Sequence, residues 1–258
     1  MHWLLLRGLA REQRHWGDFP PVFARSLPHT TAHCLDLPGA GTEHRRRSPD
    51  TIATIADDVR TRWLSLRHDH PGPWGLFGMS LGGMVAMDWC ASHPADFARV
   101  VLASTSAGDL SRPWRRFGLA ILPRAVRVLA GRDALRRERG ILTMTTELVA
   151  DADAIAADWA RYPDDRPMAR TNVLRQLRAA SVFRAPPRLD VPTLVMAGAG
   201  DRMTDPSCSR RLAARFGAKL VIHPAAGHEL CLDAPTWVTG EIASWLGQVS
   251  SPATSESA

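Results

Sequence analysis

The chain has 258 residues, 45% of them hydrophobic, and carries a formal net charge of +6 at pH 7. This length and composition suit a single globular domain with a sizeable core. No window approaches the ~18 consecutive apolar residues of a membrane span, and no metal-ligand spacing, phosphate-binding loop or nucleic-acid motif is present. We therefore expect no metal, no cofactor, no nucleic-acid partner and no integral membrane contact.

The two ends of the chain and its cysteines indicate where in the cell the protein is expected. The apolar run at 4–6 is too short for the apolar core of a signal peptide. Cys34, Cys90, Cys208 and Cys231 show no C-x-x-C spacing, which is typical of reduced thiols in a cytoplasmic protein. The segment 250–258 is small and polar, and is predicted to be a disordered tail.

Strand-like and helix-like segments alternate along the chain. Short apolar runs predict strands at 3–6, 33–37, 74–77, 99–103, 193–197 and 219–222. Amphipathic or small-residue patterns predict helices at 19–26, 50–67, 81–92, 207–216 and 236–248. Such alternation predicts an α/β fold, with a mostly parallel sheet of about six strands and helices on both faces.

The segment 109–188 interrupts this alternation between the fourth and fifth predicted strands. It is much longer than a crossover connection requires and is helical in pattern, notably at 117–129, 142–150 and 168–180. It holds 16 Arg and nine Asp or Glu, a net of +7, against −1 for the rest of the chain. One interpretation is that this basic segment attracts an anionic substrate or an acidic carrier protein. The other is that the arginines reflect a GC-rich genome and simply lie on helix faces exposed to solvent.

The segment Gly78-Met79-Ser80-Leu81-Gly82 is a G-x-S-x-G sequence between a predicted strand and a predicted helix. A sharp turn of this kind strains and exposes the serine, as a nucleophile requires. A side chain at 78 or 82 would collide with the neighbouring strand or helix. Ser80 is therefore the candidate nucleophile.

A serine nucleophile needs a histidine base, and the base needs a carboxylate to orient it. Asp201 and His228 follow two later predicted strands, at the sheet edge where ligands bind in open α/β folds. Asp205, just before Pro206, is the alternative acid. His228 is preferred over the other histidines because it follows Gly227 after the last strand, whereas His223 precedes a proline.

On these residues the chain resembles the α/β-hydrolase superfamily. Three further stretches match. The family's first strand and oxyanion loop resemble Leu4-Leu-Leu-Arg-Gly-Leu9 followed by Trp16. The loop after the next strand resembles Asp36-Leu-Pro-Gly-Ala-Gly41, and the acid-bearing loop resembles Gly198-Ala-Gly-Asp201 with Pro206. Arg7 departs from the histidine common beside Gly8. The resemblance implies a core of 1–108 and 189–249, a shortened sheet, and a helical cap at 109–188.

The resemblance also implies a function. The chain looks similar to small capped serine carboxylesterases, among them those that demethylate pimeloyl methyl ester on acyl carrier protein. The backbone N–H groups of Leu9 and Leu81 would bind the oxyanion, and Trp16, Met79 and Trp114 are candidates for the substrate pocket. Alternatives are a thioesterase, lysophospholipase, perhydrolase or carbon–carbon hydrolase, or a non-catalytic binder of a small ligand.

Overall fold

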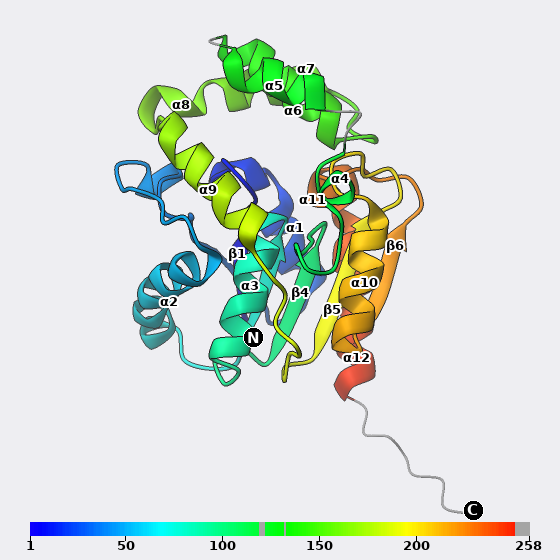
Figure 1. The fold of residues 1–258 in the computed structure, drawn as a ribbon. Helices are drawn as coiled ribbons and strands as arrows, with labels where there is room; N and C mark the ends of the chain where they lie inside the picture. The colour runs from blue at the N-terminus through cyan, green and yellow to red at the C-terminus, as the bar shows by residue number, and fades with distance from the viewer. Residues whose placement is uncertain (119–121, 132, 251–258) are drawn as a thin grey trace, which may run out of the picture.

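The computed structural model describes residues 1–118, 122–131 and 133–250, and is built around one sheet (Figure 1). Its strands run in the order β2-β1-β3-β4-β5-β6, and each neighbouring pair is parallel. The bounds are β1 (His2–Leu6), β2 (Thr31–Cys34), β3 (Trp74–Met79), β4 (Arg99–Ala103), β5 (Thr193–Gly198) and β6 (Lys219–His223). The predicted sheet of about six strands is confirmed, and it is parallel throughout.

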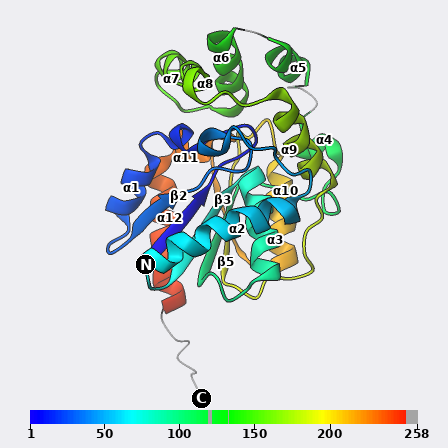
Figure 2. The same ribbon diagram turned by 90° about the vertical axis from the view of Figure 1, so that its left-hand side faces the viewer.

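Helices cover both faces of this sheet (Figures 1 and 2). One face carries α2 (Ile52–Asp69), α3 (Leu81–Ser92) and α10 (Pro206–Phe216), and the other carries α1 (Phe19–Ser26) and α12 (Pro235–Ser250). Three short helices lie in the loops: η1 (Gln13–Trp16), η2 (Gly41–Glu43) and α11 (Leu230–Asp233). The α/β architecture expected from the sequence is thereby confirmed.

The core has two halves because successive strand residues point to opposite faces. Leu4 and Leu6 of β1 pack with α2 and α3, whereas Trp3 and Leu5 pack with α1 and α12. The side chains of all four are fully buried. The central strands are therefore apolar on both faces, as is usual for parallel sheets.

The predicted second strand is wrong at its end. The run was expected to continue to Leu37, but β2 ends at Cys34. The carboxylate of Asp36 accepts hydrogen bonds from the backbone N of Gln13 (2.6 Å) and of Thr42 (2.8 Å). These bonds turn the chain away from the sheet, although Leu37 is still buried in the core.

Further helices between β4 and β5 lie above the carboxyl-terminal edge of the sheet (Figures 1 and 2). They are α4 (Pro113–Arg116), α5 (Leu122–Ala130), α6 (Ala134–Thr145), α7 (Ala152–Ala160), α8 (Tyr162–Asp165) and α9 (Arg170–Val182). We refer to residues 109–188 as the cap segment. That the cap segment forms a unit separate from the sheet and its helices remains a prediction.

The predicted helix at 142–150 is wrong, because the chain leaves the helix after Thr145. Two aspartates set the real boundaries: Asp133 accepts from the backbone N of Arg136 at the start of α6, and Asp151 accepts from that of Ala154 at the start of α7. Both are N-caps. The predicted helix at 117–129 falls partly on 119–121, outside the described residues, as does the predicted tail from 251 onward.

Two buried amide side chains on α9 fasten the cap segment to loops of the sheet. Gln176 accepts from the backbone N of Ala10 (3.0 Å) and donates to the carbonyl of Pro38 (3.3 Å). Asn172 accepts from the backbone N of Ser48 (3.0 Å) and donates to the carbonyl of Arg46 (3.0 Å). The loop that follows β1 is thus held from above by α9.

All four cysteines are free thiols, and Cys90, Cys208 and Cys231 are buried. Burial raises the pKa of the Cys231 thiol well above its ordinary value, and that of Cys208 also rises. In the described part of the chain, no helix combines the length and the apolarity needed to span a bilayer.

The packing of the central strands predicts a specific stability loss. Leu102 on β4 is fully buried, whereas Leu64 on α2 is 41% exposed. Leu102→Ala leaves a cavity and should lower the free energy of unfolding by about 3 kcal/mol, while Leu64→Ala should change it by less than about 0.5 kcal/mol. Urea unfolding followed by tryptophan fluorescence measures both, and equal losses would contradict this assignment of the core.

Candidate active site

The turn between β3 and α3 holds Ser80 in a conformation that L-residues rarely adopt, with φ 55° and ψ −115°. A Cβ atom at Gly78 would lie 2.4 Å from the carbonyl oxygen of Gly82, and one at Gly82 would lie 2.3 Å from that of Leu6. The expected collisions at both glycines are confirmed. The backbone N of Ser80 donates to the carbonyl of Ala103 (2.9 Å), which ties the turn to β4.

Three polar side chains from separate strand ends meet in one hydrogen-bonded chain. Nε2 of His228 lies 3.0 Å from Oγ of Ser80, and Nδ1 lies 2.8 Å from Oδ2 of Asp201. His228 and Asp201 are 4% and 6% exposed. The arrangement brings a hydroxyl, an imidazole and a carboxylate into the order that nucleophilic catalysis by serine uses.

The alternatives left open by the sequence have other partners. Asp205 caps α10 by accepting from the backbone N of Ser207 (2.8 Å), and it pairs with Arg115 (2.8 Å). His223 accepts from the backbone N of Ala226 (2.9 Å). Asp201, by contrast, faces His228, and its second oxygen accepts from two backbone N–H groups of the following turn.

Opposing influences act on the pKa of His228. Burial lowers it, but the charge of Asp201 and the hydrogen bond to it raise it, as does the charge of Glu229, while Arg7 opposes them. The net result is a pKa above the ordinary value of 6.5. The imidazole therefore accepts a proton more readily than an isolated histidine does.

A buried ion pair lies beside this histidine. Nη2 of Arg7 donates to both carboxylate oxygens of Glu229, each at 2.9 Å, and the two residues are 3% and 4% exposed. Arg7 also donates to Sδ of Met79 (3.4 Å), and its guanidinium lies 4.7 Å from the ring centre of Trp16. Arg7 thus links the loop after β1 to the backbone that carries His228.

A cavity of about 930 Å³ lies between Ser80 and the cap segment. Its volume is in the upper part of the range for small-molecule sites. The apolar side chains that line it include Leu9, Val128, Ile141, Met144, Val173 and Leu177. Such a wall suits an acyl chain whose reactive end lies at the serine.

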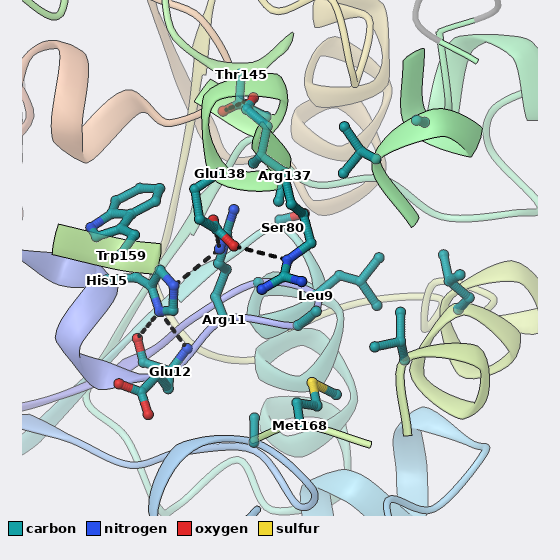
Figure 3. Close-up of a pocket in the computed structure, with 18 of the residues that line it drawn as sticks. Leu9, Arg11, Glu12, His15, Ser80, Arg137, Glu138, Thr145, Trp159 and Met168 are labelled. Carbon is teal, nitrogen blue, oxygen red and sulfur yellow. Dashed lines mark hydrogen bonds and ion pairs between the residues drawn. The ribbon is translucent and has the colours of Figure 1, made fainter. Parts of the chain in front are cut away.

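One wall of the cavity is polar (Figure 3). Nη1 of Arg11 donates to Oε2 of Glu138 (2.8 Å) and to Nε2 of His15 (3.0 Å), and Nε of Arg137 donates to Oε1 of Glu138 (3.3 Å). Burial, reinforced by Arg11, holds the pKa of His15 well below its ordinary value, so this imidazole is neutral. Arg11 and Arg137 thus face the one carboxylate of Glu138, while Glu12 in the same wall pairs with Arg14, so the wall keeps a net positive charge.

Leu9 and Met79 line the cavity, and Leu81 is the first residue of α3, next to the serine. Trp16 and Trp114 are not among the described residues that line it, so their assignment to this pocket is corrected. Trp16 is 2% exposed because it packs into the core under Arg7. Trp114 is 47% exposed and stacks with Arg112 at the surface.

The sequence analysis missed the polar side chains around the site. Arg7 and Glu229 are 222 residues apart, and Arg11 and Glu138 are 127 apart. Of these residues, only Arg7 could have been recognised in the sequence, because a charge at the end of an apolar strand requires a buried partner. Nothing in the sequence marked Gln176 on α9 as a buried residue, although it is fully buried.

The curated relatives include esterases that cover most of the chain. One is the pimeloyl-[acyl-carrier protein] methyl ester esterase of Xanthomonas campestris, 28% identical over 82% of this chain and 81% of its own length. The enzyme with the same name from Neisseria meningitidis serogroup B is 27% identical over 87% of this chain and 84% of its own length.

Solved structures share the fold. A thermophilic esterase from Thermogutta terrifontis superposes with a TM-score of 0.72 at 20% identity, covering 97% of this chain and 91% of its own. An enol-lactonase from Burkholderia xenovorans superposes with a TM-score of 0.70 at 21% identity, covering 95% and 91%.

The family model described as the alpha/beta hydrolase fold matches residues 4–235. The matched range runs from β1 through the turn of Ser80 and the loops that carry Asp201 and His228 to the start of α12. The chain therefore belongs to the α/β-hydrolase fold family.

Proposed function

We propose that the protein is a serine hydrolase that cleaves carboxylic esters. The observation that carries this proposal is the position of His228, whose two ring nitrogens contact Oγ of Ser80 (3.0 Å) and the carboxylate of Asp201 (2.8 Å). A serine has little nucleophilicity unless a base removes its proton, and the arrangement supplies that base. The esterase names of the curated relatives support the same reaction class.

In the proposed first half-reaction, Nε2 of His228 takes the proton of Ser80 as Oγ attacks the ester carbonyl carbon. The tetrahedral intermediate then collapses, and His228 gives its proton to the departing alcohol oxygen. This leaves the acyl group esterified to Ser80 and releases the alcohol. Asp201 holds the imidazole in the required orientation and stabilises its protonated form.

In the second half-reaction, water enters the position that the alcohol has left. His228 removes one proton from the water, and the resulting oxygen nucleophile attacks the acyl carbon. Collapse of this intermediate releases the carboxylic acid and returns the proton to Oγ of Ser80. No group beyond water and the substrate is consumed.

Two backbone N–H groups are proposed to stabilise the oxyanion of both intermediates. Leu81 begins α3, where the N–H groups of the first turn have no intrahelical partner and the helix dipole favours negative charge. Leu9 lies in the loop that Gln176 holds through Ala10. Removing a donor of this kind typically raises the barrier by about 3 kcal/mol.

The cavity under the cap segment is proposed to hold the acyl chain. Its apolar side chains suit the methylene groups, and the net positive charge of Arg11, Arg137 and Glu138 suits a polar or anionic substituent. By analogy with the relatives, we propose an acyl group delivered on an acyl carrier protein, with the net +7 of the cap segment attracting an acidic partner. The cytoplasmic location stays a prediction.

The nucleophile is tested by Ser80→Ala. Hydrolysis of p-nitrophenyl esters from acetyl to dodecanoyl should fall by several orders of magnitude, because the variant lacks the hydroxyl on which the acyl intermediate is proposed to form. Circular dichroism should be unchanged, and labelling by a fluorophosphonate probe should disappear. Turnover near the wild-type level in this variant would rule out the mechanism. A wild-type protein that neither labels nor turns over any ester would favour a binding role.

The role of Asp201 is tested by the pH dependence of kcat/KM. The wild-type rate should rise as His228 loses its proton, with a midpoint above pH 6.5 because its pKa is raised. Asp201→Asn removes the charge that raises this pKa, so the midpoint should move to lower pH while kcat falls on the order of 10⁴-fold. Asp205→Asn is the matched control, and a larger effect from it would reassign the acid.

The acyl pocket is tested by filling it from α9. Val173 lines the cavity, whereas Val182 on the same helix is 58% exposed and lies outside the lining. Val173→Trp should shift the chain-length optimum of the ester series toward shorter acyl groups while acetyl ester hydrolysis persists. Val182→Trp should leave the optimum unchanged. An unchanged optimum for Val173→Trp would place the acyl chain elsewhere.

A further inference from the structure

Three histidines from distant parts of the sequence meet at the end of the sheet away from the cap segment. His2 begins β1, His33 lies in β2, and His70 is the C-cap of α2. One ring nitrogen of each lies within 4.8 Å of those of the other two. Among the residues that the structure describes, no other group of three potential ligand side chains is this close together.

The spacing of these nitrogens matches that of ligands on one ion. Two nitrogens bound to tetrahedral Zn²⁺ at ~2.0–2.1 Å are separated by about 3.3 Å. Nδ1 of His2 and Nε2 of His33 are 3.2 Å apart and share a hydrogen bond, so an ion would take the place of the proton between them. The ligand nitrogen of His70 lies within 4.8 Å of the other two, so a movement on the order of 1.5–2 Å would bring it to the same separation. All three side chains are partly buried, so an ion could enter from solvent.

The surroundings hold the rings in place. Trp74 packs against His2 and His33, with ring centres 5.1 and 4.9 Å apart, and its indole N–H donates to the carbonyl of His70 (3.2 Å).

We propose that His2, His33 and His70 form a binding site for one divalent transition-metal ion, Zn²⁺, with a water molecule as the fourth ligand. Imidazole nitrogen is a preferred ligand of zinc, and three histidines with water are a known ligand set for it. The ion would join β1, β2 and the end of α2. It therefore should stabilise the fold, since an ion that binds the folded chain shifts the equilibrium away from the unfolded one.

The site is separate from the proposed reaction. The active-site loop follows Leu6, at the other end of β1, which is four residues or ~13 Å from His2. Zinc at the histidine cluster should raise the melting temperature without changing ester hydrolysis. Zinc bound at His228 would instead inhibit hydrolysis, so the two places can be told apart.

The test is a titration of the untagged protein with Zn²⁺, followed by calorimetry and by thermal unfolding. Wild type should bind one ion per chain and melt at a higher temperature with zinc present. His33→Gln, which keeps a hydrogen-bonding side chain, should bind at least tenfold more weakly and lose the thermal shift. His68→Ala is the matched control, because His68 is an exposed histidine on α2 outside the cluster.

Two further measurements keep the outcome decisive. If His33→Gln does not fold, His70→Gln at the helix end takes its place, with the same expected loss. Co²⁺ in place of Zn²⁺ should give the visible absorption of a four-coordinate ion in wild type and not in either variant. Absence of zinc binding to wild type, or equal affinity in wild type and both histidine variants, would overturn the proposal and leave the cluster as packed rings.

Discussion

The close approach of α3 to the end of β1 is the constraint on which the rest of the site depends. A Cβ at Gly82 would lie 2.3 Å from the carbonyl of Leu6, so the helix can start this near the strand only because residue 82 has no side chain. The same approach forces Ser80 to φ 55°. It also brings the first N–H groups of α3 beside the loop that contains Leu9, so the strain at Ser80 and the closeness of the two proposed oxyanion donors share one cause.

Two buried ion pairs lie near this turn, one beside His228 and one in the cavity wall. Arg7 binds Glu229 with both oxygens at 2.9 Å, next to His228, and Arg11 binds Glu138 at the cavity wall. Removing such ions from water is costly, and a buried pair contributes to stability only when its geometry compensates. The Arg7 pair joins the loop after β1 to the residue that follows the histidine. It therefore connects the proposed oxyanion donor and the proposed base through one rigid contact.

The cap segment and the sheet contribute different parts of the candidate site. The sheet edge supplies the hydroxyl, imidazole and carboxylate, whereas the cap segment supplies most of the apolar cavity wall. The two parts are not independent, because Gln176 and Asn172 on α9 bind backbone groups of the loops after β1 and β2. A change in α9 can therefore reach the reacting atoms as well as the acyl pocket.

The charge of the cap segment bears on association with a partner and not on the fold.

Features that depend on local sterics and on chain order could be predicted before the fold was known. The G-x-S-x-G turn, the parallel sheet and the order Ser80, Asp201, His228 could be predicted because each depends on short-range geometry or on strand ends that share one edge. The tertiary structure alone decided the rest. It brought together residues that are far apart in the chain, as in the Arg7–Glu229 and Arg11–Glu138 pairs and the cluster of His2, His33 and His70. Helix boundaries in the cap segment also escaped prediction, because α6 and α7 begin at the side-chain caps of Asp133 and Asp151, which the apolar periodicity does not mark.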